Sequence, residues 1–226
     1  MTDLRLVIFD VDGTLVDSQD MIFDAFTFAY QQAGLPVPAR SHALSFVGMS
    51  LETIFPALSP EQDAATHAAL AQGYRDAYKH LRETRGSTAT SPFFPGARAA
   101  LAALAAQDWT LMAVATGKSR RGLDKLVEGH GLHGLFQSTQ TADTHPSKPH
   151  PSMIHAILSE TGVAPDRAVM VGDTSFDIDM ARAAGVRSIG VRWGYHPPET
   201  LRADRLIADF DALLPNIDDL IGPNHV

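Results

Sequence analysis

Short apolar runs recur along the chain, and the segments between them have helical spacing of apolar residues or a helix-favouring composition. Four of these runs are four or five residues long and lie at residues 6–9, 111–115, 168–171 and 188–191. Nearly continuous apolar runs are typical of strands that are buried on both faces, as in a parallel sheet with helical crossovers. The pattern therefore predicts the α/β fold class, with a parallel sheet flanked by helices.

Residues 16–90 have a different pattern, in which helical spacing replaces the strand-like runs. Apolar positions between Ile22 and Ala33 follow the spacing of a helix, and this pattern ends at Gly34. A second helix is predicted to begin at Ser59, which offers an N-cap with Pro60 in the first turn. The polar stretch at residues 86–92 is typical of a linker or hinge. The predicted domains are a core at residues 1–15 and 91–226 and an all-helical insert at residues 16–90.

Composition narrows the range of functions. The chain has 226 residues, of which 45% are hydrophobic, and can bury a substantial core. Its net charge of −8 argues against a general binder of nucleic acids or anionic membranes, which would carry basic excess. The chain contains no cysteine, so thiol chemistry and cysteine zinc sites are excluded. No apolar stretch is typical of a membrane span or signal peptide, and we expect a cytoplasmic location.

Two carboxylates follow the first apolar run directly, in the order Asp10, Val11, Asp12, Gly13 and Thr14. Because side chains alternate along an extended backbone, Asp10 and Asp12 can point the same way. One carboxylate can then be attacked or bind a metal ion while the other moves protons. The alternative is a simple turn, because Asp and Gly are common turn residues.

Polar residues also follow the second run, where Thr116 and Gly117 lead into a predicted helix. A hydroxyl, a close backbone approach and free amides at a helix start suit a phosphate group. An ordinary strand-to-helix loop capped by Ser119 explains the same residues equally well. Ligands of open parallel sheets bind beyond the carboxyl ends of the strands, so these residues can converge with Asp10.

The third run leads into a dense group of acids at Asp173, Asp177 and Asp179. Hard oxygen ligands favour magnesium or calcium, and a site with few protein ligands completed by phosphate and water favours magnesium. We interpret Asp173 as a metal ligand. For Asp177 a helix cap is the alternative, and Asp179 is expected to face solvent.

Lys148 lies in a proline-rich run, with Pro146 and Pro149 on either side. Prolines stiffen the backbone and would hold the ammonium group in place. This context is compatible with an electrostatic clamp on a charged intermediate. Taken alone, the residue is better explained as an exposed surface lysine.

Four segments in this order, residues 10–14, Thr116, Lys148 with Pro149, and residues 172–177, resemble the four motifs of the haloacid dehalogenase superfamily. The helical insert after the first motif is similar to the cap of its phosphoglycolate phosphatase and β-phosphoglucomutase-like members, which share the pattern Lys148-Pro149-x-Pro151. The resemblance implies a Rossmann-like parallel sheet with an inserted, all-helical cap domain. True dehalogenases lack an acid at the position of Asp12, so phosphoryl transfer is favoured.

The resemblance also implies a magnesium-dependent phosphatase that hydrolyses a small phosphomonoester, phosphoglycolate-like or a sugar phosphate, through an aspartyl phosphate. Asp10 would be the nucleophile and Asp12 the general acid and base. The transferring phosphoryl group would be bound by Thr116, Gly117 and Lys148. Many relatives carry asparagine at the position of Gly117. Magnesium would be held or supported by Asp10, Asp12, Asp173 and Asp177.

Two other functions remain open at this point. A phosphomutase would return the phosphoryl group to a sugar instead of water. A receiver-like signalling protein also clusters acids at strand ends, although it has no need of a long helical insert. Within the insert, residues 48–50 are the segment expected to reach inward, with an ordinary interhelical loop as the alternative. No feature indicates an oligomeric state.

Overall fold

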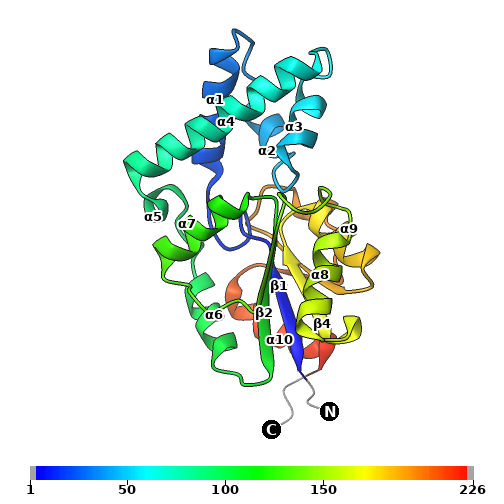
Figure 1. Ribbon diagram of the computed structural model, residues 1–226. Coiled ribbons are helices and arrows are strands. Elements are labelled where there is room, and N and C mark those ends of the chain that lie inside the picture. Colours follow the sequence, from blue (N-terminus) through cyan, green and yellow to red (C-terminus); the bar gives the residue numbers. More distant parts are fainter. Residues whose placement is uncertain (1–3, 223–226) are drawn as a thin grey trace.

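The computed structural model describes residues 4–222 and contains a six-stranded parallel sheet (Figure 1). The strand order is β3-β2-β1-β4-β5-β6, which is the order of a Rossmann sheet. The strands are β1 (Arg5–Phe9), β2 (Thr110–Thr116), β3 (Ser138–Thr141), β4 (Ala168–Gly172), β5 (Arg187–Val191) and β6 (Arg205–Ile207). The predicted fold class is confirmed. The outermost residues of the predicted core, 1–3 and 223–226, lie outside the described residues.

Helices cover both faces of the sheet. One face packs against α6 (Ala97–Ala105), α7 (Arg120–His130) and α10 (Leu213–Ile221), and the other packs against α8 (Ser152–Thr161) and α9 (Ser175–Ala183). Because side chains alternate along a strand, Val7 and Phe9 of β1 join the first apolar cluster, and Leu6 and Ile8 join the second. Short 3-10 helices are η1 (Pro165–Arg167), η2 (Pro198–Thr200) and η3 (Phe210–Ala212).

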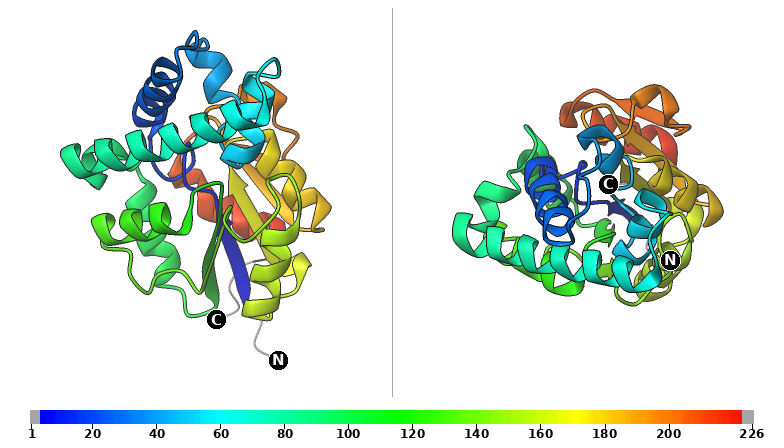
Figure 2. Two further views of the ribbon diagram at one scale, coloured as in Figure 1. Left: turned by 45° about the horizontal axis from the view of Figure 1, so that its top comes forward. Right: turned by 90° about the horizontal axis from the view of Figure 1, so that it is seen from above.

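A group of helices stands beyond the carboxyl ends of the strands, as both Figure 1 and the left view of Figure 2 show. These are α1 (Gln19–Gln32), α2 (Arg40–Leu44), α3 (Leu51–Leu58), α4 (Ala64–Arg85) and α5 (Ser87–Thr90). Their apolar cluster includes Phe26, Phe55 and Tyr74, and the ring centre of Phe26 lies 4.9 Å from that of Tyr74. Among the described residues, no helix is both long and apolar enough to cross a lipid bilayer.

One local prediction in this helical insert was wrong, and a second needs more detail. The longest helix, α4, starts at Ala64 and not at Ser59, because Asp63 caps it by accepting a hydrogen bond from Thr66 N at 2.8 Å. Ser59 lies at the end of α3, and its hydroxyl is 2.7 Å from that of Tyr30. The stretch predicted as a plain linker contains the one-turn helix α5. Local capping signals therefore located helix ends only to within a few residues.

The two connections between insert and core lie side by side. Val16 forms an antiparallel bridge with Phe93, and Asp17 N donates to Pro92 O at 2.8 Å. Phe94 N donates to the carbonyl of Leu15 at 3.0 Å. Both passages of the chain are therefore fixed next to the loop that follows β1.

Candidate active site

The carboxyl ends of β1, β2 and β4 meet at the edge of the sheet below the insert. Phe9, the last residue of β1, pairs with residues of both neighbouring strands, including Val171 of β4. Asp10 N continues this ladder by donating to Val171 O at 2.9 Å. Asp10 therefore emerges beside Asp173, which follows β4, and near Thr116, which ends β2. The sheet brings together residues that lie far apart in the sequence.

The loop after β1 folds back against the end of β4. Leu15 N donates to Val11 O at 2.9 Å, which closes a tight turn. Gly13 has a φ of 84°, and a Cβ there would lie 2.2 Å from Asp173 Oδ2. Thr14 Oγ1 donates to Asp173 Oδ1 at 3.0 Å. Glycine is required at position 13 both for the backbone conformation and for contact with this carboxylate.

Lys148 is buried between two carboxylates. Its Nζ donates to Asp10 Oδ1 at 2.6 Å and to Asp177 Oδ1 at 2.7 Å, and all three side chains are at most 1% exposed. Burial alone would lower the pKa of Lys148, but Asp10 and Asp177 raise it above its usual value. The surface alternative for Lys148 is wrong, because the ammonium group is buried between Asp10 and Asp177.

Asp177 takes part in capping helix α9, as the alternative interpretation predicted, and it also contacts Lys148. Helix α9 begins at Ser175 with Thr174 as its N-cap, and Asp177 Oδ2 accepts from Thr174 N at 3.0 Å in a capping box. The other carboxylate oxygen of Asp177 binds Lys148. Asp179, two residues further along the helix, is exposed and pairs with Arg182 at 2.6 Å, as expected.

Three buried carboxylates form a compact group. Asp10, Asp173 and Asp177 each offer an oxygen atom, and these atoms lie within 4.8 Å of one another. Burial raises the pKa of Asp10 to about 7, although Lys148 opposes the shift. Burial, together with Asp10 and Asp177, also raises the pKa of Asp173 well above its usual value. Among the described residues, Asp10 Oδ2 has no hydrogen-bond partner. Crowded, hard oxygen donors with an open position fit a divalent cation.

Asp12 is not a member of this group, and its carboxylate is held from another side. Lys118 Nζ lies 2.8 Å from Asp12 Oδ1, and Ser18 Oγ donates to the same oxygen. Lys118 Nζ also donates to the hydroxyl of Tyr78 at 2.8 Å. The four predicted metal residues include Asp12, but its carboxylate pairs with Lys118 and is not part of the group formed by Asp10, Asp173 and Asp177.

The end of β2 has the predicted architecture of a strand-to-helix junction. Thr116 is 1% exposed, and its Oγ1 accepts from Lys118 N at 3.3 Å. Ser119 caps α7 by accepting from Gly122 N at 3.2 Å. This capping is the feature that the ordinary-loop alternative predicted. The junction also borders the cavity described below, so capping and ligand binding are compatible here.

Gly117 allows the insert to touch the core. A Cβ at Gly117 would lie 2.6 Å from the carbonyl oxygen of Gly48 and 3.0 Å from that of Met49. Next to this contact, Ser50 N donates to Ser147 Oγ at 2.9 Å. The segment at residues 48–50 therefore reaches inward, and the asparagine that many relatives carry after the threonine would have no room in this arrangement.

Residues that no motif indicated complete the site. Tyr195 N donates to Asp173 Oδ2 at 2.8 Å, and Tyr195 OH lies 3.1 Å from Ser18 Oγ. Tyr78 and Lys118 form the bridge to Asp12. Of these four, two had a sequence signal: Lys118 follows Thr116 and Gly117 directly, and Tyr195 lies shortly after the apolar run that ends at Val191. The others are brought in by contacts between distant segments.

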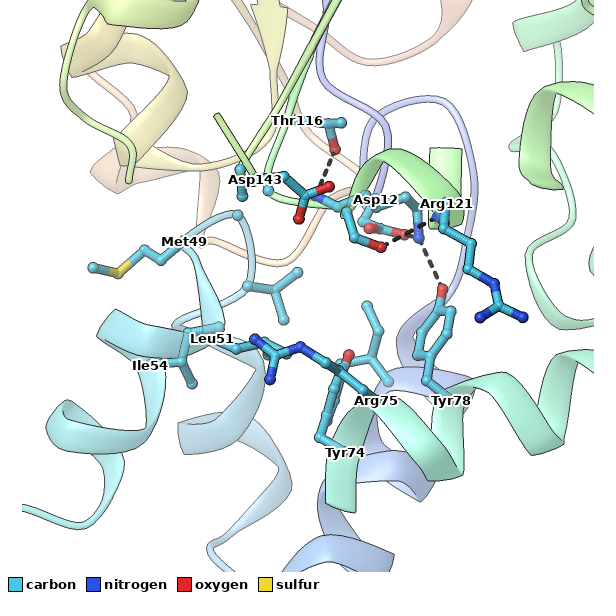
Figure 3. Close-up of a pocket in the computed structure, with 18 of the residues that line it drawn as sticks. Asp12, Met49, Leu51, Ile54, Tyr74, Arg75, Tyr78, Thr116, Arg121 and Asp143 are labelled. Carbon is cyan, nitrogen blue, oxygen red and sulfur yellow. Dashed lines mark hydrogen bonds and ion pairs between the residues drawn. The ribbon is translucent and has the colours of Figure 1, made fainter. Parts of the chain in front are cut away.

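A cavity of about 490 Å³ lies between the carboxyl edge of the sheet and the insert (Figure 3). Asp12 and Thr116 line it from the core. Leu51, Ile54 and Tyr74 line it from α3 and α4. Asp10 also borders this space, and the cavity therefore gives a ligand direct access to its carboxylate.

Burying charged side chains costs free energy, and such buried groups cluster at catalytic sites. The acids and the lysine at the carboxyl edge of this sheet therefore define an enzyme. The family model described as haloacid dehalogenase-like hydrolase matches residues 7–191. The chain belongs to this family, and the predicted resemblance is confirmed.

Individual relatives agree with this assignment. "Probable phosphatase IndB" of Dickeya dadantii is 36% identical over 224 residues, which cover 97% of this chain and 93% of that protein. A "Phosphoglycolate phosphatase" of Chromobacterium violaceum is 34% identical over 205 residues, covering 89% of this chain and 90% of that protein. A haloacid dehalogenase-like hydrolase from Streptococcus pneumoniae has a similar structure, with a TM-score of 0.81, 26% identity and coverage of 96% and 99%. The predicted enzyme class, a phosphatase of this family, is confirmed.

Proposed function

We propose that the chain is a magnesium-dependent phosphatase that hydrolyses a phosphomonoester through an aspartyl phosphate on Asp10. The observation that carries this proposal is the state of the Asp10 carboxylate. Lys148 holds Oδ1 at 2.6 Å, while Oδ2 has no hydrogen-bond partner among the described residues. A carboxylate that is oriented on one side and open on the other is suited to act as a nucleophile.

The steps follow from the placement of the chain's own residues. Asp10 attacks phosphorus in line, the bond to the leaving oxygen breaks, and Asp12 donates a proton to that oxygen. Asp12 then takes a proton from water, which attacks phosphorus, releases inorganic phosphate and restores the Asp10 carboxylate. Lys148 and the end of β2 at Thr116 and Gly117 bind the phosphoryl oxygens.

Asp10, Asp173 and Asp177 are the side chains that would hold magnesium, with Asp173 and Asp10 as ligands and Asp177 in support. When bound, the cation would neutralise the crowded carboxylates and the phosphoryl dianion, which otherwise repel each other. The raised pKa values of Asp10 and Asp173 support this assignment, because burial and the neighbouring carboxylates disfavour their ionised forms and a further cation at this position would favour them. A chain with a net charge of −8 can then bind an anionic substrate.

The helical insert acts as a cap domain in this proposal. We place the core at residues 1–15 and 91–226 and the cap at residues 16–90. The separate apolar cluster of the insert and the paired connections at Val16 and Phe93 support these boundaries. A cap over the cavity would exclude water while Asp10 attacks and would contact the leaving group.

Multiple turnover with metal dependence is the first expected result. With magnesium and a set of phosphomonoesters that includes phosphoglycolate, sugar phosphates and nucleotides, the enzyme should release many equivalents of inorganic phosphate. Chelation of divalent cations should lower this rate at least about 100-fold, because the nucleophile and the phosphate would repel. Adding magnesium back should restore it. Free phosphate is measured against time in all three conditions.

The same assay tests the alternative reaction. A phosphomutase would convert a sugar phosphate into its isomer and release little phosphate, which product chromatography detects. Turnover that persists at the full rate after chelation would contradict the metal assignment. A receiver-like signalling role is set aside, because the chain belongs to a family of hydrolases.

The close contact at Gly117 gives a second prediction. Gly117→Ala should lower kcat/KM by about ten- to hundredfold, because its methyl group must displace the backbone at Gly48, and shifts near 1 Å are that costly to catalysis. Gly73→Ala on α4 is the control, since its added Cβ meets first the flexible end of Gln32. Steady-state kinetics and chemical unfolding are compared for both variants. Wild-type kinetics in Gly117→Ala would show that this contact does not position the cap.

A further inference from the structure

The cavity is enclosed by an insert that is already docked on the core. Tyr78 of α4 bonds to Lys118 of the core at 2.8 Å, and Ser50 N bonds to Ser147 at 2.9 Å. On a third side, His196 Nε2 lies 2.8 Å from the carbonyl oxygen of Ser45. The space of about 490 Å³ therefore exists with the insert in contact with the core, and it is the space in which a bound substrate would lie.

This space falls within the range of roughly 300–1,000 Å³ that is typical of sites for drug-sized ligands. Phosphoglycolate consists of a phosphoryl group and a two-carbon acid, and its phosphoryl group would occupy the polar wall beside Asp10 and Thr116. Much of the cavity would then contain only water. The volume indicates a larger alcohol part.

Part of the wall that faces the phosphoryl site is apolar. Met49, Leu51 and Tyr74 are half-buried, and they border the cavity next to the buried side chain of Ile54 (Figure 3). Apolar side chains that line a cavity gain free energy when a ligand displaces water from them, by about 25 cal/mol per Å² of apolar surface removed from water. A small, fully charged acid would leave this wall in contact with water.

Several cationic side chains line the cavity, among them Arg75, Lys79 and Arg82 on α4 and Arg121 on α7. Arg75 follows Tyr74 on α4, but its guanidinium forms an ion pair with Glu52 of α3. The pair neutralises the charge beside Leu51 and Tyr74, so this part of the wall offers little attraction to a carboxylate. Its chemistry matches the ring or hydrocarbon part of a substrate better than a second anionic group.

We propose that the substrate is the phosphomonoester of a bulky, partly apolar alcohol, whose ring or hydrocarbon part packs against Leu51, Ile54 and Tyr74. This inference rests on the proposed phosphatase function and narrows it, since it places phosphoglycolate among the poor substrates. The phosphoryl group lies at Asp10, and the apolar part lies below α3 and α4. Substrate choice is therefore made by the wall of the insert.

The test compares two primary alkyl monoesters, 2-phenylethyl phosphate and ethyl phosphate, whose leaving oxygens are chemically similar. We expect kcat/KM to be at least about tenfold higher for the phenylethyl ester, since a well-fitting apolar group gives this degree of discrimination. Leu51→Trp fills the cavity and should reduce this ratio at least about tenfold. Ala57→Trp, on an exposed position of α3 outside the cavity lining, should leave both rates unchanged.

Each outcome bears on a different statement. A wild-type ratio near one, or a ratio that Leu51→Trp leaves unchanged, overturns the inference, while magnesium-dependent hydrolysis of ethyl phosphate or phosphoglycolate would still support the phosphatase function. Absence of phosphate release from all three esters with magnesium overturns both. If Leu51→Trp folds poorly, Met49→Trp in the loop before α3 makes the same comparison.

Discussion

Asp10→Asn is expected to lower kcat by about 10⁴-fold or more while the fold stays intact. An amide of the same shape cannot form the aspartyl phosphate, and loss of a nucleophile commonly removes most of the catalysed rate. Lys148 keeps Asp177 as a partner at 2.7 Å and can still donate to the asparagine carbonyl. Because burial raises the pKa of Asp10 to about 7, its ionised form is disfavoured inside the fold. Removing that charge should therefore not lower the free energy of unfolding at pH 7.

Two measurements test this prediction. Phosphate release is followed under single-turnover conditions, and mass spectrometry after rapid acid quenching looks for a phosphorylated chain in the wild type. Asp179→Asn is the matched control, because Asp179 follows the same strand as Asp173 but lies exposed in a surface ion pair. Magnesium-dependent turnover at the wild-type rate in Asp10→Asn would overturn the nucleophile assignment.

The positions of the polar residues at the strand ends were predictable, because they depend only on which residues follow each apolar run in the sequence. An apolar run specifies a buried strand, and the residue after it must lie at the carboxyl edge of a parallel sheet. Asp10, Thr116 and Asp173 each follow such a run, and the structure brings them together at one edge. The roles assigned to them remain proposals that the variants above test.

Strand β3 and the bridge to the insert could not be predicted in this way. Residues 138–141 read Ser-Thr-Gln-Thr, which has no apolar run, and they form a strand because they pair with β2 at the edge of the sheet. The bond between Tyr78 and Lys118 depends on where a long helix crosses the core. Lys148 gave an ambiguous signal, because only tertiary packing decides whether a lysine beside prolines is buried.

Asp173→Asn is expected to abolish most magnesium binding without weakening the metal-free fold. Folding raises the pKa of Asp173 above its usual value, so ionised Asp173 destabilises the folded state at neutral pH. Asparagine removes this charge. Its carbonyl can accept from Tyr195 N, and the hydroxyl of Thr14 can rotate to accept from its amide. The melting temperature of the metal-free variant should equal or exceed that of the wild type.

With magnesium present, the wild type should gain more in melting temperature than Asp173→Asn. At about a hundredfold excess over Kd, a bound cation stabilises the wild type by about 2.7 kcal/mol, which raises the melting temperature of a chain of this size by roughly 5–10 °C. Asp173→Asn should lose most of this shift, and its turnover should fall at least about 100-fold at the same magnesium concentration. Asp143→Asn tests a cavity acid outside the buried group and should keep the shift. Loss of a charged ligand weakens metal binding. An undiminished shift in Asp173→Asn would therefore mean that Asp173 is not a ligand and that the metal is held elsewhere.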